Sequence, residues 1–296
     1  MRIGLDIGGT KIEGCAIKSD GSEIIRKRVP SPIDDYEKVL QVVENLVQDI
    51  ETYVGKRCSI GIGIPGTISK STGLVKNANS THLIGQALDS DLRMRLQRPI
   101  RVCNDANCFT LSEATDGAGS IYKSVFGVIL GTGVGGGLVI NNILIDGPNG
   151  ITGEWGHNQL DVTSAKSAPQ CYCGKLGCIE SYLSGPGLER DYSRTTSVIL
   201  STKDIVDAAK SGKIYAEAAL NRYEKRLAKA LASVINIVDP DVIVLGGGLS
   251  NIDRLYENLP PLLNAHVFSD NVETKILPPA HGDSSGVRGA ARLWEE

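Results

Sequence analysis

The alternation of apolar and polar positions predicts a chain of short strands and helices. Three apolar segments near the N-terminus predict strands over Arg2–Ile7, Ile12–Ile17 and Glu23–Val29, with Gly8-Gly9-Thr10 as the first turn. Apolar residues then recur with helical spacing over Tyr36–Val54, which predicts a helix. The chain therefore begins as an antiparallel meander followed by a helix.

Strands and helices continue to alternate beyond this point. Ser59–Ile64 and Ile100–Cys103 are further apolar strands, and a helix is expected to follow the second strand through Glu113. The order then starts again with strands Val125–Leu130 and Val134–Ile140. Such alternation is typical of an α/β fold, here a duplicated one.

The second half of the chain contains the longest predicted helix. Apolar residues from Tyr223 to Val238 are spaced as in a helix that ends before Pro240, and Val242–Leu245 is the next strand. A final helix is expected at about 287–296. Since 296 residues are more than a domain with a single hydrophobic core usually contains, we expect two lobes with a cleft between them. We expect the first lobe to consist of residues 1–118 together with the C-terminal helix, and the second lobe to consist of residues 119–286.

Composition and charge exclude several classes of protein. The net charge is −3 and basic residues form no run, which argues against nucleic acid as a partner. Because no segment has the roughly 18 apolar residues of a membrane span, and the N-terminus does not resemble a signal peptide, we expect a cytoplasmic protein. The odd number of cysteines, seven, also argues against a secreted disulfide framework.

Glycine-rich turns follow three of the predicted strands. The first begins with Asp6 and contains Gly8, Gly9, Thr10 and Lys11. Glycine lets backbone N–H groups approach phosphate oxygens, Thr10 and Lys11 add a hydroxyl and a positive charge, and Asp6 is a suitable ligand for Mg²⁺. An ordinary hairpin turn is the alternative interpretation.

The second and third glycine-rich turns lie in the other half of the chain. They are formed by Gly131, Thr132 and Gly133, and by Gly246, Gly247 and Gly248, which are expected to open a helix. Each turn alone is a weak signal, but three of them at strand ends in a duplicated chain favour phosphate binding.

A cysteine cluster predicts a structural zinc site. Cys171, Cys173 and Cys178 gather three thiolates within eight positions, and interleaved glycines let the loop wrap around an ion. His157 is the best candidate for the fourth ligand. A redox pair or reactive surface thiols would not explain three cysteines with this spacing.

Polar residues after another strand and around the cysteine cluster predict an acceptor site. Asn104 and Asp105 follow a strand and begin a helix, where an α/β protein presents catalytic groups, although a helix N-cap is an equally natural role for one of them. Glu154, His157 and Glu180 flank the cysteine loop and suit hydrogen bonds to sugar hydroxyls.

With these residues in place, the chain resembles the ROK family of bacterial sugar kinases and sugar-responsive repressors, over essentially its whole length. The resemblance is carried by segments 6–11, 104–105, 130–137, 153–157, 171–180 and 239–248. It implies a two-lobed actin-like, hexokinase-like (RNase H-like) fold, a homodimer, and ATP, Mg²⁺ and zinc as ligands.

The resemblance also implies roles for individual residues. Asp105 would be the catalytic base for the acceptor hydroxyl. The sugar would be bound by Asn79, Asn104, Asp105, Glu154, His157 and Glu180. The ATP site would be lined by Asp6, Gly8, Gly9, Thr10, Lys11, Gly131, Thr132, Gly133, Gly246, Gly247 and Gly248.

The acceptor is the least determined feature. Segments 77–81, 171–175 and 281–286 are most similar to the fructokinase branch, sometimes described as manno(fructo)kinase, so the expected reaction is phosphorylation of D-fructose to D-fructose 6-phosphate. N-acetylglucosamine, mannose and glucose kinases of the same family are the alternatives. A repressor would need a DNA-binding segment ahead of the first strand, and a non-catalytic sugar sensor would have no use for Asp105.

Overall fold

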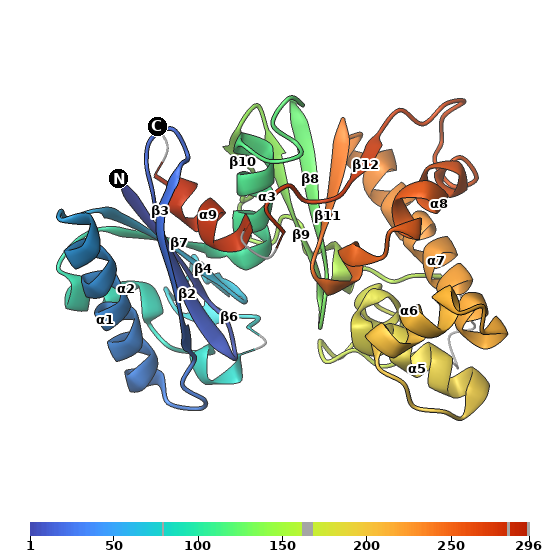
Figure 1. Ribbon diagram of the computed structural model, residues 1–296, viewed down its shortest axis with the longest axis horizontal. Coiled ribbons are helices and arrows are strands. Elements are labelled where there is room, and N and C mark those ends of the chain that lie inside the picture. Colours follow the sequence, from blue (N-terminus) through green and yellow to red (C-terminus); the bar gives the residue numbers. More distant parts are fainter. Residues whose placement is uncertain (79, 162–167, 283–284, 295–296) are drawn as a thin grey trace. The chain divides into compact units, whose positions relative to one another are not determined.

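The computed structural model describes residues 1–78, 80–161, 168–282 and 285–294. They group into two compact units, the first made of Met1–Ser120, Gly137–Thr152 and Ala280–Glu296, and the second of Ile121–Gly136 and Gly153–Pro279. Helices accompany a five-stranded sheet in each half of the chain (Figure 1), so the predicted α/β class is confirmed.

The sheet of the first unit has the strand order β3-β2-β1-β4-β7. Its strands are β1 (Arg2–Ile7), β2 (Lys11–Ile17), β3 (Glu23–Pro30), β4 (Ser59–Ile64) and β7 (Ile100–Asn104), with β5 (Thr67–Ile68) and β6 (Val75–Lys76) as a separate small hairpin. The helical segments are α1 (Tyr36–Val54), η1 (Thr81–Leu83), α2 (Leu88–Leu96), α3 (Asp105–Thr115) and α9 (Ser285–Arg292).

The second sheet has the order β10-β9-β8-β11-β12. Its strands are β8 (Ser124–Leu130), β9 (Val134–Ile140), β10 (Ile143–Leu144), β11 (Val242–Gly246) and β12 (Lys275–Leu277). The helical segments of the second unit are η2 (Trp155–His157), α4 (Glu180–Leu183), α5 (Gly185–Thr196), α6 (Thr202–Lys210), α7 (Ile214–Val238), η4 (Gly248–Asn251) and α8 (Arg254–Leu263).

The two sheets have the same topology, which confirms the predicted duplication. In each of them an antiparallel hairpin, β1-β2 or β8-β9, is extended on one side by a third strand and on the other side by two parallel strands. The tight connection between β9 and β10 is formed by Asn141 and Asn142, both with positive φ, as a two-residue hairpin turn requires.

Alternate residues of β1 and β2 face different helices in the first unit. Gly14 of β2 lies against Leu46 and Ile50 of α1. Gly4 of β1, which is paired with the next residue of β2, Cys15, lies instead against Val287 of α9. The period of two along a strand sends successive side chains to opposite faces. Helices α1 and α9 therefore cover opposite faces of this sheet, and α9 is the C-terminal helix expected from the sequence.

Glycines allow α9 to lie unusually close to the sheet. A methyl group on Gly4 of β1 or on Gly61 of β4 would lie closer than 3.0 Å to a backbone carbonyl oxygen of α9, at Val287 and Ala290 respectively. Any larger residue at these positions would have to push the helix away from the sheet. The close packing ties the C-terminal helix to the two strands at the centre of the first unit.

Candidate functional site

Residues of the first unit that were expected to bind nucleotide and acceptor lie at one edge of its sheet. Strands β1, β4 and β7 run parallel, with Asp6 opposite Gly63 and Ile64 opposite Asn104 in the register. Their carboxyl ends therefore meet at the same edge, where ligands bind in open α/β sheets. The structure thus brings together Asp6, the turn from Gly8 to Lys11, and the pair Asn104-Asp105.

The turn between β1 and β2 is a tight hairpin, as the predicted antiparallel meander requires. The N–H of Gly8 donates to the carbonyl oxygen of Lys11 at 2.9 Å, and Gly9 and Thr10 are exposed at the tip. A methyl group on Gly9 would lie 3.2 Å from the hydroxyl oxygen of Ser80, so there is little room for a side chain here. An exposed glycine tip of this kind remains open to a phosphate.

Asn104 caps α3, whereas Asp105 is its first residue. The side-chain oxygen of Asn104 accepts hydrogen bonds from the N–H groups of Ala106 (2.9 Å) and Asn107 (3.2 Å), and its amide nitrogen donates to the carbonyl oxygen of Gly66 at 3.1 Å. These bonds satisfy donors that a helix N-terminus leaves unpaired. Asn104 therefore has a structural role, while it also fixes the backbone that carries Asp105.

The carboxyl group of Asp6 has an unusual electrostatic environment. Burial, together with the nearby charge of Glu13, raises the pKa of Asp6 from 3.8 to about 6, although Lys11 and Arg28 act in the opposite direction. Glu13 itself is buried and forms ion pairs with Arg26 (2.7 Å) and Arg28 (2.6 Å). A bound cation would offset the cost of ionising Asp6 in these surroundings.

The two glycine-rich turns of the second unit also share a sheet edge. Strands β8 and β11 run parallel with Ile129 opposite Gly246. Gly247 has a φ of +79°, and a methyl group there would lie closer than 3.0 Å to the carbonyl oxygen of Leu130, immediately before Gly131. Only glycine suits this position. Gly248 begins a 3-10 turn of four residues, at the point where the sequence predicted the start of a helix.

Four side chains of the second unit converge as predicted for a metal site. The ligand atoms of His157, Cys171, Cys173 and Cys178 all lie within 4.8 Å of one another. The sulfur atoms of Cys173 and Cys178 are 3.6 Å apart, and Sγ of Cys171 is 3.7 Å from Nδ1 of His157. Backbone turns at Gly174 (φ +87°) and Gly177 (φ +70°) wrap the loop around this point.

These distances fit a tetrahedral zinc ion. With Zn–S bonds of about 2.3 Å, the sulfur ligands of a tetrahedral site are about 3.8 Å apart. The sulfur atoms of Cys173 and Cys178, 3.6 Å apart, lie close to that value, and three thiolates with one imidazole are a common ligand set of structural zinc. The residues present therefore fit the group that the sequence predicted.

The segment carrying Glu154 and His157 is held against β9. The indole nitrogen of Trp155 donates to the carbonyl oxygen of Gly135 at 2.8 Å, and a methyl group on Gly156 would lie closer than 3.0 Å to the carbonyl oxygen of Val134. This close approach explains the glycine before His157. The segment is thereby fixed to the strand that follows the turn of Gly131 to Gly133.

Glu180 connects the same strand to the cysteine cluster. One carboxylate oxygen accepts a hydrogen bond from the N–H of Val134 at 2.9 Å, and the other lies 3.8 Å from Sγ of Cys171. A displacement of Cys171 would therefore also displace Glu180 and, through it, the glycine turn that precedes Val134.

One residue at this site was missed from the sequence. The phenol oxygen of Tyr172 lies 3.1 Å from Nε2 of His157, and the two rings meet edge to face with centroids 5.3 Å apart. Despite this contact, 65% of the surface of Tyr172 is exposed to solvent. Its position between two cysteines carries no signal of its own, because the contact with His157 depends on how the loop folds. Asn79, another expected sugar ligand, lies outside the described residues.

Duplicated sheets of this topology with glycine turns at their edges are those of hexokinase-like sugar kinases, and the comparisons with known proteins agree. The solved structures that resemble the chain include the ROK hexokinase of Thermus thermophilus (TM-score 0.87, 28% identity, 98% of this chain and 96% of that one). They also include a ROK family glucokinase of Streptomyces griseus in complex with glucose and AMPPNP (TM-score 0.81, 26% identity, 99% and 98%).

The chain belongs to the ROK family, whose family model matches residues 2–296. Among curated proteins it is 43% identical over 299 residues to the N-acetyl-D-glucosamine kinase of Yersinia pseudotuberculosis serotype O:3 (strain YPIII), covering 99% of this chain and 98% of the relative. The resemblance to the family that the sequence suggested is confirmed. The narrower expectation of a fructokinase is not supported, because the curated relatives with about this level of identity, 41% to 43%, are N-acetylglucosamine kinases.

A membrane-spanning helix was not expected, and within the described ranges no helix combines the length and the apolar character needed to cross a bilayer.

Proposed function

We propose that this sugar kinase transfers the terminal phosphoryl group of ATP to a hydroxyl of N-acetyl-D-glucosamine. The observation that carries this choice of acceptor is the 43% identity, along almost the entire chain, to a curated N-acetyl-D-glucosamine kinase. Fructose was inferred from short segments that the fructokinase branch shares. A match spread over 299 residues outweighs these short segments.

On the nucleotide side, we propose that the glycine turns bind phosphate oxygens through their backbone N–H groups. The turn of Gly8 to Lys11 belongs to one sheet edge, and the turns 131–133 and 246–248 share the equivalent edge of the other sheet. Mg²⁺ bound with the nucleotide would neutralise phosphate charge. Asp6 is placed to hold that ion directly or through water, and Lys11 adds a positive charge beside it.

On the acceptor side, we propose that Asp105 accepts the proton of the attacking hydroxyl. Phosphoryl transfer depends mainly on alignment and charge stabilisation, which leaves the protein one specific proton-handling task at the acceptor. Asn104 holds the first turn of α3 and thus the backbone of Asp105. Glu154, His157 and Glu180 are the proposed partners of the sugar hydroxyls.

The proposed zinc ion would have a structural role. His157, Cys171, Cys173 and Cys178 would hold it. With Nδ1 of His157 toward the thiols, Nε2 faces outward, where Tyr172 now contacts it. The cluster would then orient the imidazole on one side, and a sugar hydroxyl could take the place of the Tyr172 phenol at the other nitrogen. The family resemblance further supports a cytoplasmic homodimer.

A panel of acceptors tests this proposal. ADP release would be measured for the purified protein with N-acetylglucosamine, fructose, glucose and mannose, and phosphorylated products would be identified by mass. We expect the highest kcat/KM with N-acetylglucosamine. A higher value with fructose would restore the fructokinase assignment. Sugar-dependent thermal stabilisation without any ADP would instead indicate a non-catalytic sensor.

A further inference from the structure

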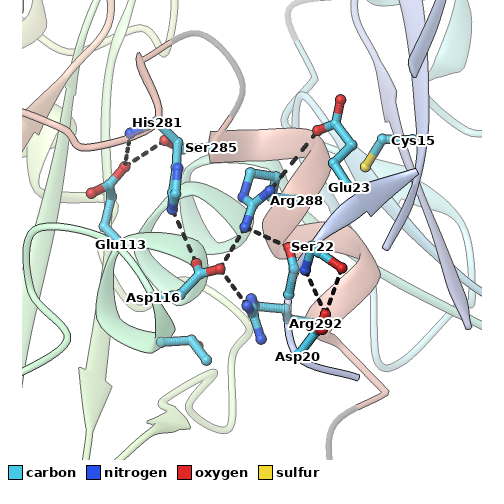
Figure 2. Close-up of polar contacts among 12 residues, drawn as sticks. Cys15, Asp20, Ser22, Glu23, Glu113, Asp116, His281, Ser285, Arg288 and Arg292 are labelled. Atoms are coloured by element: carbon cyan, nitrogen blue, oxygen red, sulfur yellow. Dashed lines mark hydrogen bonds and ion pairs between the residues drawn. The ribbon is translucent and has the colours of Figure 1, made fainter. Parts of the chain in front are cut away.

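Glu113 is a completely buried carboxylate inside the first unit, eight positions after Asp105 in α3. Its oxygens accept hydrogen bonds from the N–H groups of Ala118 (2.9 Å), Ala280 (2.9 Å) and His281 (3.2 Å) and from the hydroxyl of Ser285 (2.5 Å). Three of these four donors belong to the segment that leads into α9 (Figure 2). A single side chain of α3 thus holds the entry into the C-terminal helix.

Asp116, at the end of α3, strengthens the same attachment. One of its oxygens lies 3.1 Å from Nε2 of His281, and the other accepts hydrogen bonds from Arg288 and Arg292 of α9. Figure 2 shows these contacts side by side with those of Glu113. We call Glu113, Asp116, His281, Ser285 and Arg288 the α3–α9 clasp.

The helix that the clasp holds lies against Asp6. A methyl group on Gly286 would lie 3.6 Å from Oδ2 of Asp6, and one on Gly4 would collide with the carbonyl oxygen of Val287. Both glycines thus bring the backbone of α9 close to β1, and the side chain nearest to Gly286 is that of Asp6 itself. Any displacement of the first turn of α9 therefore changes the surroundings of Asp6 directly.

We propose that Glu113 is a positioning residue for the nucleotide: by holding Ser285 and the backbone at 280–281, it fixes the first turn of α9 against Asp6. The inference rests on the proposed function, in which Asp6 holds the magnesium ion of the nucleotide. Glu113 itself touches neither the nucleotide nor the acceptor. Its effect is transmitted through one helical turn, as with the outer partners that orient metal ligands in other proteins.

The chain contains a matched control for a purely structural carboxylate. Glu224 in α7 of the second unit is also buried, with 3% exposure, and is paired with Arg254 (2.5 Å) and Asn258 (3.0 Å). Replacing either glutamate by glutamine removes a buried charge from a hydrogen-bonded cluster and lowers stability. Only the change at Glu113 should alter nucleotide binding.

The experiment compares Glu113→Gln and Glu224→Gln with the unaltered protein. Affinity for a magnesium complex of a non-hydrolysable ATP analogue and KM for Mg·ATP are measured, together with zinc content and the KM of the acceptor. For Glu113→Gln we expect affinity for the magnesium complex to fall about tenfold. Zinc content and acceptor KM should stay within about twofold. Ser285→Ala, which removes one of the four hydrogen bonds, should give a smaller change in the same direction.

Combination with Asp6→Asn separates positioning from general damage. If Glu113 acts through Asp6, the double variant should bind the magnesium complex no more weakly than Asp6→Asn alone. Unchanged nucleotide affinity in a folded Glu113→Gln protein, or fully additive losses in the double variant, would overturn the inference. Failure of N-acetylglucosamine as acceptor would overturn only the proposed substrate, whereas an unaltered protein that does not bind the magnesium complex would overturn both proposals.

Discussion

Gly289 of α9 crosses Cys108 of α3 so closely that a methyl group on the glycine would lie closer than 3.0 Å to the cysteine's carbonyl oxygen. The atom in the way belongs to the backbone of a buried helix, which cannot move aside like a flexible side chain. Because α3 begins with Asp105 and α9 lies against Asp6, this crossing sets the relative position of the two carboxylates at the edge of the first sheet.

Gly289→Ala is therefore expected to destabilise the protein by about 1–3 kcal/mol, as overpacked cores do. Alanine normally stabilises the interior of a helix relative to glycine by roughly 0.5–1 kcal/mol, so the sign of the change is informative. Urea denaturation of the variant and the parent measures it. A variant that is as stable as the parent would show that α3 and α9 are less closely packed than described.

Cys178→Ser is expected to lose the bound zinc. The thiol is buried and lies 3.6 Å from Sγ of Cys173, so serine would leave an incomplete ligand set in a site built for sulfur. Metal analysis should find about one zinc per chain in the parent and much less in the variant, with lower thermal stability and weaker sugar binding. Cys58→Ser is the control, because Cys58 is a buried cysteine outside the cluster, and it should retain zinc. A metal-free parent with full activity would contradict the structural role of zinc.

Asp105→Asn is expected to lower kcat by about 10² to 10⁴ while sugar affinity changes much less. Asparagine keeps the shape of the side chain, and the N-cap provided by Asn104 keeps the helix start, but the amide cannot accept the proton of the hydroxyl. Steady-state kinetics with N-acetylglucosamine, ATP and Mg²⁺ varied in turn should show a defect that no substrate concentration rescues. Near-normal turnover in the folded, zinc-loaded variant would remove Asp105 as the base.

Asp6→Asn is expected to be more stable than the parent above about pH 6, when neither nucleotide nor magnesium is present. The pKa of Asp6 in the folded protein is about 6, compared with its ordinary value of 3.8, so the folded state disfavours the ionised form. The contribution of Asp6 to the stability of the parent therefore falls by up to about 3 kcal/mol as the pH rises from about 4 to about 6, and the neutral asparagine makes no such contribution.

Denaturation of both proteins at pH 4 and pH 8 measures this difference. The stability of Asp6→Asn relative to the parent should increase between the two values. An unchanged difference would show that the charge of Asp6 is already compensated in the nucleotide-free protein. In steady-state kinetics, the size of the Asp6→Asn defect should change with the magnesium and ATP concentrations, whereas the Asp105→Asn defect should not.

Several features of this protein follow from short segments of sequence. The spacing of apolar residues determines the strands around Asp6 and the long helix before Pro240, since strand and helix periodicities are local properties. Asn104 caps α3 through bonds from the N–H groups two and three residues further on, and Cys171, Cys173 and Cys178 lie within one short loop. These features need few partners that are distant in the sequence. Helix α8 includes Pro260 and Pro261, and because proline normally ends a helix, its extent does not follow from the local pattern.

Other features depend on residues that are far apart in the chain. Glu113 meets Ser285 across 172 positions, and Gly61 accommodates the backbone of Ala290, yet neither residue carries a local signal of its partner. The contact of Tyr172 with His157 likewise appears only when the loop closes. Periodicity records which face of an element is buried, but not which other element covers it. Those pairings are selected by packing the whole unit at once, so only the tertiary structure decided them.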